Sequence, residues 1–232
     1  MKICYIVAMR AEAQPFIEHY GVKLLEGFFA PLPCLSYHAS IQGSDLYIVL
    51  NGEQHGSDLI GCEAASVAAL SAIQKIQPDL VVNSGTCGAF LSNGANIGDV
   101  YLGSGVMFHD RRVAGDDEWG TQALGNYPVW EGTADLAQSL GFKLGKVTTG
   151  SSLDMQPCDE EIIRQNHGEL KDMEAAAIAF VCSLFKLPIL LVKSVTDLCD
   201  SGASTYEEFS KNLALASERL REANVRIIDA LV

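Results

Sequence analysis

Short, continuous apolar runs alternate along the chain with longer segments in which apolar residues recur at helical spacing. Continuous apolar runs of this length predict strands that are buried on both faces. We expect such strands over residues 3–9, 79–83, 98–108, 143–149 and 187–195. Residues 33–50 predict a β-hairpin instead, because two strand-like runs flank a turn at residues 42–45.

Helical spacing predicts helices over residues 57–77, 133–140 and 172–185, and another that begins near Met9. A capping box, Thr205-x-x-Glu208, predicts the start of a C-terminal helix. Strands and helices that alternate in this way are typical of an α/β fold. We therefore expect one domain over residues 1–232, a three-layer α-β-α arrangement around a central mixed, largely parallel sheet.

Composition excludes several classes of partner. The 232 residues are 48% hydrophobic, and their formal net charge is −13. An acidic chain argues against nucleic acid as a partner, because binding a phosphate backbone requires Lys and Arg. No apolar run approaches the ~20 residues that span a membrane, so no membrane partner is expected. Seven scattered cysteines without CxxC spacing, and an N-terminus that enters a strand without a signal peptide, predict reduced thiols in a cytoplasmic protein.

Three acidic side chains are predicted to meet at one edge of the sheet. Glu12 and Asp197 each follow a predicted strand, a glycine-containing loop over residues 84–88 follows another, and Glu174 opens a very apolar helix. Ligands of α/β proteins bind where the carboxyl ends of strands share an edge. Each feature alone has a simpler interpretation, a helix-start acid or a tight turn. Their convergence on one cleft is the hypothesis that the topology favours.

Two further segments carry candidate chemistry. His109 lies in a polar cluster after the strand that ends at Phe108, and a solvated surface loop is the favoured interpretation for it. Residues 114–132 are rich in Gly, Asp and polar residues and contain both tryptophans. We expect a long excursion there, and such loops are often functional.

Five sequence blocks occur in a familiar order. They are Ile6-Val7-Ala8-Met9-x-x-Glu12, Asn83-Ser84-Gly85-Thr86-Cys87-Gly88, Phe108-His109-Asp110, Asp172-Met173-Glu174-Ala175-Ala176-Ala177 and Val195-Thr196-Asp197. Together they resemble the 5'-methylthioadenosine/S-adenosylhomocysteine nucleosidases of the nucleoside phosphorylase/hydrolase superfamily. Residues 96–100, 109–112 and 152–155 look most like the plant-type branch. The resemblance covers nearly the whole chain.

The resemblance implies hydrolysis of the N-glycosidic bond of a 5'-thioadenosine, which releases adenine and a 5-thioribose. It assigns Asp197 as general acid toward N7 of the base, a task for which a raised pKa is needed. It assigns Glu12 to the attacking water and Glu174 to the ribose hydroxyls and the developing cation. Carboxyl groups on either side of a glycosidic bond, with room for water, follow the same logic in other glycosidases.

Other roles implied by the resemblance concern binding. Met173 would pack on the ribose, and the backbone of Asp154 would help Leu153 to hold adenine. The remaining implied positions are Thr86, Cys87 and Gly88 around base and ribose, and Met9 and Tyr206 beside the 5'-alkylthio group. Val113 looks like a contribution from a second subunit, so a homodimer is expected. The resemblance implies no cofactor and no metal.

This sequence departs from the family pattern at several positions, and these departures leave the substrate range open more than the type of reaction. Many relatives have Gly-Asp-Ser where this chain has Gly150-Ser151-Ser152, Ala89 replaces a glycine, and residues 53–57 and 113–117 diverge from the plant pattern. Another adenosine-like substrate, such as aminodeoxyfutalosine, therefore stays open.

Two rival functions stay open as well. A purine nucleoside phosphorylase of this fold would need arginine for phosphate, but none precedes the glycine loop and Glu12 would repel phosphate. A non-catalytic nucleoside-binding or storage protein would be expected to have lost one of the three acids.

Overall fold

The computed structural model describes residues 1–113 and 118–232. Among these residues, nine strands form one mixed sheet in the order β10-β9-β8-β11-β7-β1-β4-β3-β2. The strands are β1 (Lys2–Val7), β2 (Lys23–Leu24), β3 (Leu35–Ile41), β4 (Ser44–Leu50), β7 (Leu80–Ala89), β8 (Val100–Phe108), β9 (Lys143–Thr149), β10 (Leu170–Asp172) and β11 (Ile189–Leu198). Parallel pairing joins β4, β1, β7 and β11 through the middle of the sheet. The predicted β-hairpin is β3–β4, which pairs antiparallel.

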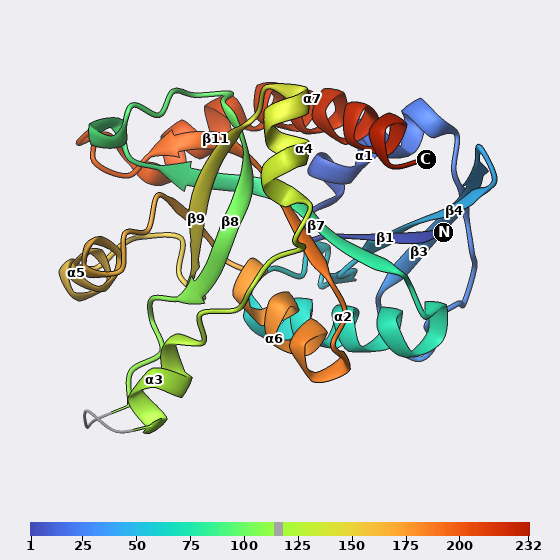
Figure 1. Cartoon of the computed structure of the whole chain (residues 1–232), viewed down its shortest axis with the longest axis horizontal. Coiled ribbons are helices and arrows are strands. Elements are labelled where there is room, and N and C mark those ends of the chain that lie inside the picture. The colour runs from blue at the N-terminus through green and yellow to red at the C-terminus, as the bar shows by residue number, and fades with distance from the viewer. Residues whose placement is uncertain (114–117) are drawn as a thin grey trace.

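Helices cover both faces of the sheet, as Figure 1 shows, so the predicted three-layer α/β fold is confirmed. One face carries α1 (Arg10–Tyr20), α4 (Thr133–Leu140) and α7 (Thr205–Leu231), and the other carries α2 (Cys62–Ile76) and α6 (Ala175–Phe185). The shorter elements are α3 (Glu118–Leu124), α5 (Pro157–Gln165), the 3-10 turn η1 (Leu91–Asn93), β5 (Glu53–Gln54) and β6 (Ser57–Asp58). Within the described ranges, no helix is long and apolar enough to cross a membrane.

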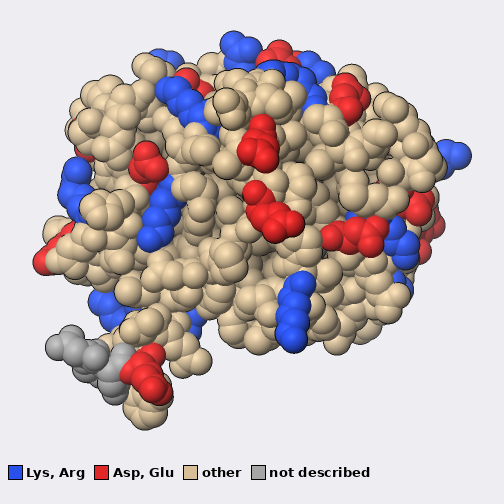
Figure 2. Space-filling view, in the orientation of Figure 1, with Lys and Arg blue, Asp and Glu red and all other residues tan. Residues whose placement is uncertain are grey.

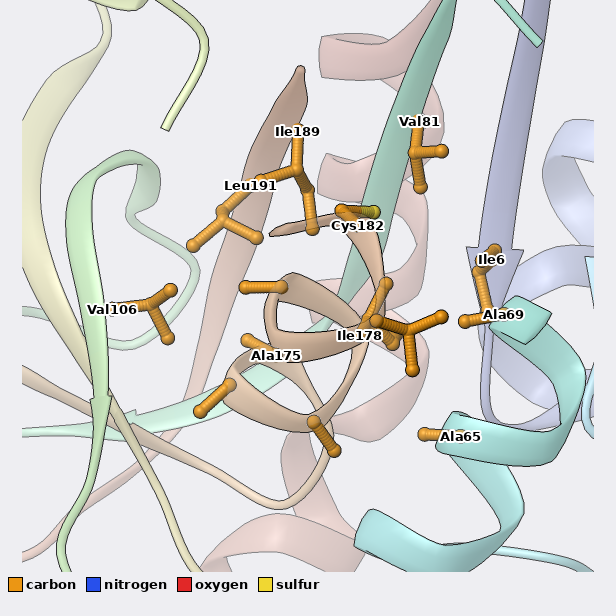
Figure 3. Close-up of a cluster of buried hydrophobic side chains, with 14 of the residues drawn as sticks. Ile6, Ala65, Ala69, Val81, Val106, Ala175, Ile178, Cys182, Ile189 and Leu191 are labelled. Carbon is orange, nitrogen blue, oxygen red and sulfur yellow. The ribbon is translucent and has the colours of Figure 1, made fainter. Parts of the chain in front are cut away.

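Each face of the sheet has its own hydrophobic core. Between α2, α6 and the sheet, alanines such as Ala65 and Ala69 face Ile178 and strand residues such as Ile6 (Figure 3). Small side chains allow two helices and a sheet to approach closely and fill space without voids. This core fixes the start of α6, which positions the residues before it.

Several predicted boundaries differ from the structure because strand pairing includes residues that were expected in a helix or a loop. The helix predicted from residue 57 begins at Cys62, because Ser57–Asp58 pairs with Glu53–Gln54 and Gly61 turns the chain at a φ of 91°. The predicted loop over residues 84–88 is part of β7, because β11 pairs with β7 along this whole stretch. The helix predicted from residue 172 begins at Ala175, since Asp172 ends β10.

The C-terminal helix begins where predicted but with a different cap. Ser204 is the N-cap, and its side chain accepts a hydrogen bond from the Glu207 amide. Glu208 instead accepts the amide of Leu198 at the end of β11, so the predicted box is wrong. Within the predicted excursion over 114–132, residues 118–124 form α3, and residues 114–117 lie outside the described residues.

The charged residues are scattered over the face shown in Figure 2, where several blue and red groups lie next to each other. That face shows no continuous basic patch of the kind that a nucleic-acid backbone would need.

Candidate active site

A cavity of about 220 Å³ opens at the edge of the sheet where β1, β7, β10 and β11 end. Its lining residues come from seven separate stretches of the chain. They are Ala8, Met9, Glu12, Ile60, Thr86, Cys87, Gly88, Leu153, Lys171, Asp172, Met173, Glu174, Thr196, Asp197, Tyr206 and Phe209. The predicted convergence of Glu12, Glu174 and Asp197 is therefore present.

Glu12 combines a helix-start position with a second set of contacts inside the cavity. Its Oε2 accepts the Met9 amide (3.3 Å), which is the local capping contact expected of an acid in a first turn. Its Oε1 accepts both the backbone amide and the hydroxyl of Thr86 at 2.7 Å. Burial raises the pKa of Glu12, while the Thr86 donors and the charge of Lys193 oppose the rise. The simpler interpretation thus explains one of these three hydrogen bonds.

Asp197 reaches the cavity because β11 contains an irregularity. Val195 pairs with Cys87 and Asp197 pairs with Gly88, so Thr196 is an extra residue on β11. Such a bulge re-aims the side chain that follows it. Asp197 is 4% exposed, and its Oδ1 accepts the Thr196 hydroxyl at 2.8 Å. Burial raises its pKa above the ordinary aspartate value, as an acid that must hold a proton requires.

Glu174 occupies the N-cap position of α6 but does not cap the helix with its side chain. Asp172 does so, because its Oδ2 accepts the Ala175 amide at 2.9 Å. The carboxyl of Glu174 instead accepts the Gly61 amide at 2.9 Å. Burial, followed by repulsion from Asp172, raises the pKa of Glu174 to about 7.

A buried ion pair lies directly behind these acids. Lys193 Nζ is 2.7 Å from Asp172 Oδ2, and the two side chains are 1% and 0% exposed. Asp172 Oδ1 also accepts the Thr149 hydroxyl at 2.5 Å. Burial alone would lower the pKa of Lys193, but the carboxylates of Asp172 and Glu174 outweigh it and hold the pKa above its usual value.

Two glycines of β7 leave the room that the acids occupy. A Cβ at residue 85 would lie 3.4 Å from Glu12 Oε1 and 3.6 Å from Lys193 Nζ. A Cβ at residue 88 would lie 2.7 Å from both Asp197 Oδ2 and Cys199 Sγ, which no real side chain tolerates without a shift. These glycines serve close approach rather than a tight turn.

Sequence reasoning missed part of the lining. Lys171 and Asp172, which line the cavity, and Lys193, which is buried behind it, were not expected in the site, although a lysine inside the apolar run 187–195 is a usable signal. A charge in a strand buried on both faces needs a partner, and the partner marks the site. Ile60 and Phe209 carry no distinguishing pattern, while Ala8 and Thr196 lie in two of the quoted sequence blocks without an assigned role. Tyr206 is at the open rim and is 68% exposed.

Asp154 and Val113 do not line this cavity, and Val113 was expected to contribute to the site of a second subunit. Asp154 is exposed and accepts the Gln156 side-chain amide at 2.7 Å, and Val113 is exposed beside the end of the described range. The solvated-loop interpretation of His109 is wrong, because the residue is 1% exposed. Its amide donates to Thr149 O at 2.9 Å and continues the pairing of β8 with β9, and burial lowers its pKa.

The donor set at the cavity is one of carboxyl groups, hydroxyls and ammonium groups. Over residues 1–113 and 118–232, no group of three or more His, Cys, Asp or Glu side chains could hold a metal ion. The seven cysteines are all free thiols.

Comparison with known proteins gives a consistent result. Residues 2–229 match the model of the phosphorylase superfamily. A 5'-methylthioadenosine/S-adenosylhomocysteine nucleosidase of Arabidopsis thaliana is 39% identical, covering 98% of this chain and 90% of that protein. A 5'-methylthioadenosine nucleosidase of the same plant is 38% identical over 98% and 86%.

The solved structures agree. The apo form of an Arabidopsis thaliana 5'-methylthioadenosine nucleosidase superimposes with a TM-score of 0.95 at 37% identity, covering 98% of this chain and 94% of that one. Full-length similarity at this level establishes shared family membership. The chain belongs to the phosphorylase superfamily and, within it, to the 5'-methylthioadenosine/S-adenosylhomocysteine nucleosidases.

Proposed function

We propose that this protein hydrolyses the N-glycosidic bond of 5'-methylthioadenosine, giving adenine and 5-methylthioribose. The observation that carries the proposal is the set of three carboxyl groups, far apart in sequence, around one cavity. Each has a different environment, and different environments allow similar acids to take different protonation states and roles. The names of the plant relatives point to the same substrate.

Asp197 is the general acid in this proposal. Cleavage of the C–N bond leaves electrons on the base, and adenine departs more readily when N7 receives a proton. The buried position and raised pKa of Asp197 support this role, because a protonated carboxyl must persist near neutral pH. The extra residue Thr196 changes the direction of the Asp197 side chain. The Thr196 hydroxyl also donates a hydrogen bond to Asp197 Oδ1.

Glu12 holds the water that attacks C1' from the opposite face. A base must be charged to take a proton, and the two Thr86 donors favour the charged form against the effect of burial. Lys193 contributes in the same direction. Lys193 forms its ion pair with Asp172, so it lowers the pKa of Glu12 without being the ion-pair partner of Glu12.

Glu174 accepts the 2'- and 3'-hydroxyls and stabilises positive charge that develops on the ribose. With a pKa of about 7, Glu174 is charged in part of the molecules at neutral pH, and this charged form lowers the energy of an oxocarbenium-like transition state. Met173 packs on the ribose, Thr86, Cys87 and Gly88 border ribose and base, and Leu153 with the Asp154 backbone holds adenine. Met9 and Tyr206 border the 5'-alkylthio group.

A phosphorolytic reaction fits this cavity less well. Among the described residues that line it, none is an arginine, and Glu12 stands where attack is proposed. A phosphate dianion beside Glu12 would be repelled by a charge in a poorly solvated site.

We propose further that the protein is a homodimer and that Val113 of one subunit approaches the site of the other. Exposed apolar side chains gather on α2 and α6, among them Val67, Leu70 and Phe180. Leu184 on α6 is 65% exposed. Contiguous exposed apolar residues mark surfaces that another chain covers. The free thiols support a reducing compartment such as the cytoplasm.

Adenine release from 5'-methylthioadenosine in phosphate-free buffer tests the function. Wild type should release adenine, and Asp197→Asn should lose at least about 100-fold in kcat, the size of a missing general acid. Asp135→Asn, on an exposed face of α4, is the matched control and should behave like wild type.

The other outcomes separate the alternatives. Turnover that requires phosphate would make the protein a phosphorylase. Turnover of S-adenosylhomocysteine or aminodeoxyfutalosine in parallel assays defines the substrate range. Nucleoside binding by wild type without any adenine release would indicate a binding protein.

A further inference from the structure

Lys171 lies in the cavity and has no role in the mechanism above. It is the middle residue of β10 and is 6% exposed. Its Nζ donates to the backbone oxygens of Ser152 (2.7 Å) and Leu153 (2.9 Å). A buried ammonium that binds two consecutive carbonyls fixes the orientation of that short stretch of backbone.

The sheet register places Lys171 in the half of the site that contains Asp197. Lys171 pairs with Gly88 on β7, and Gly88 pairs with Asp197 on β11. The next residue, Asp172, points to the other side of the strand and binds Lys193 beside Glu12 and Glu174. The site therefore has two buried lysines, one for each half.

Next to the stretch that Lys171 holds, the Ser151 amide donates to Asp110 Oδ2 at 2.7 Å. Residues 151 and 152 are exposed and belong to no helix or strand, and Leu153 lines the cavity. Without the ammonium, two carbonyl groups would lose their charged donor, and the loop would gain conformational freedom.

We infer that Lys171 is a positioning residue for the leaving base, and that it holds the Ser152–Leu153 backbone in the place where that backbone meets adenine. This inference rests on the proposed function, which assigns adenine to this half of the cavity. A residue that only stabilised the fold would not distinguish the base from the sugar. Lys171 should do so, because its two bonds end on the base segment alone.

The charge of Lys171 gives a second, independent readout. The groups that face Asp197 are Lys171 from β10, Glu208 from α7, Cys87 from β7, and Thr196 and Cys199 from its own strand end. Lys171 favours the charged form of Asp197, whereas Glu208 disfavours it. Removing the ammonium should therefore raise the pKa of Asp197 further and move the alkaline limb of kcat/KM to higher pH.

The test compares Lys171→Met, Lys171→Arg and the control Lys146→Met. Lys146 lies on the neighbouring strand β9, outside the cavity, and its Nζ also donates to a backbone carbonyl, that of Asn166. Each variant is assayed with 5'-methylthioadenosine across pH. Calorimetric titration with adenine and, separately, with 5-methylthioribose measures binding to the two halves.

Lys171→Met should lose about 10- to 100-fold in kcat/KM and in adenine affinity, the range expected for bonds to a charged donor. Its affinity for 5-methylthioribose should stay unchanged, and its alkaline limb should move upward. Lys171→Arg should recover part of the adenine affinity and restore the pH limb, and Lys146→Met should match wild type.

Equal weakening of both products with an unmoved pH limb would overturn the inference in favour of a structural role. So would a Lys171→Met protein that matches Lys146→Met in every readout. Absence of adenine release by wild type would instead refute the proposed function, and the adenine titration, which needs no turnover, would still decide on Lys171.

Discussion

At the scale of single residues, Glu174 links activity to stability. Its pKa is about 7 in the folded protein against an ordinary value of 4.5, so the folded state binds a proton more tightly than the unfolded state. The free energy of unfolding therefore falls as pH rises from about 4.5 to 7. Above pH 7 this loss of stability, the cost of ionising Glu174 in the folded protein, stays constant.

Glu174→Gln should remove this cost while abolishing turnover. The variant should equal wild type in stability near pH 4.5 and exceed it by on the order of 1–3 kcal/mol at pH 8. Urea unfolding at both pH values measures the difference. The exposed Glu161→Gln is the control, and its free energy of unfolding should differ from that of wild type by the same amount at both pH values. A Glu174→Gln protein that is less stable at pH 8 than wild type would contradict the argument.

Sequence alone identified the three acids but not their supporting groups. Glu12, Glu174 and Asp197 each stand at an element end, where local pattern and topology can place them. Lys193 and Asp172 belong to a strand and a strand end whose partner is supplied only by the tertiary fold. Lys171 binds carbonyls 18 and 19 residues away, and no local pattern predicts such a bond.

At the scale of elements, strand β7 is shaped by what must lie beside it. Gly88→Ala should displace Asp197 or Cys199, because the new Cβ would lie 2.7 Å from atoms of both. We expect a loss of about 10-fold or more in kcat, with destabilisation of about 1–3 kcal/mol from overpacking. Gly105→Ala on β8 is the matched control, since nothing lies within 4 Å of a Cβ there. Unchanged turnover by Gly88→Ala would show that catalysis does not depend on the present position of the Asp197 carboxyl.

Element boundaries were the weakest part of the prediction, and strand pairing explains most of the errors. The apolar strands were found because their patterns are long. β10 has three residues and exists through its pairing with β9 and β7. α5 is a helix of nine residues, most of them polar, so its pattern is short. The start of α2 was misplaced because Ser57–Asp58 is committed to a small sheet of its own.

At the scale of the whole molecule, we propose that the exposed apolar side chains of α2 and α6 form the dimer interface. Leu184→Glu should convert a dimer into a monomer, because a charge in an apolar interface is left without a partner. Sedimentation equilibrium measures the molecular mass, and turnover should fall in parallel if the partner completes the site. Leu215→Glu places the same charge on exposed α7 in the opposite layer and should leave the mass unchanged. A wild type that is monomeric at assay concentration would exclude the dimer.

The extra residue at Thr196 has a consequence for how this site can be altered. Along a regular strand, consecutive side chains alternate between faces, so the count of residues decides which face an acid meets. Asp197 meets the cavity only because one residue has been added opposite Cys87 and Gly88. The length of the chain between Val195 and Asp197 is thus as much a part of the site as the carboxyl itself. Deleting one residue there would exchange the faces to which the following side chains point, and no substitution at the remaining positions would restore the original alternation.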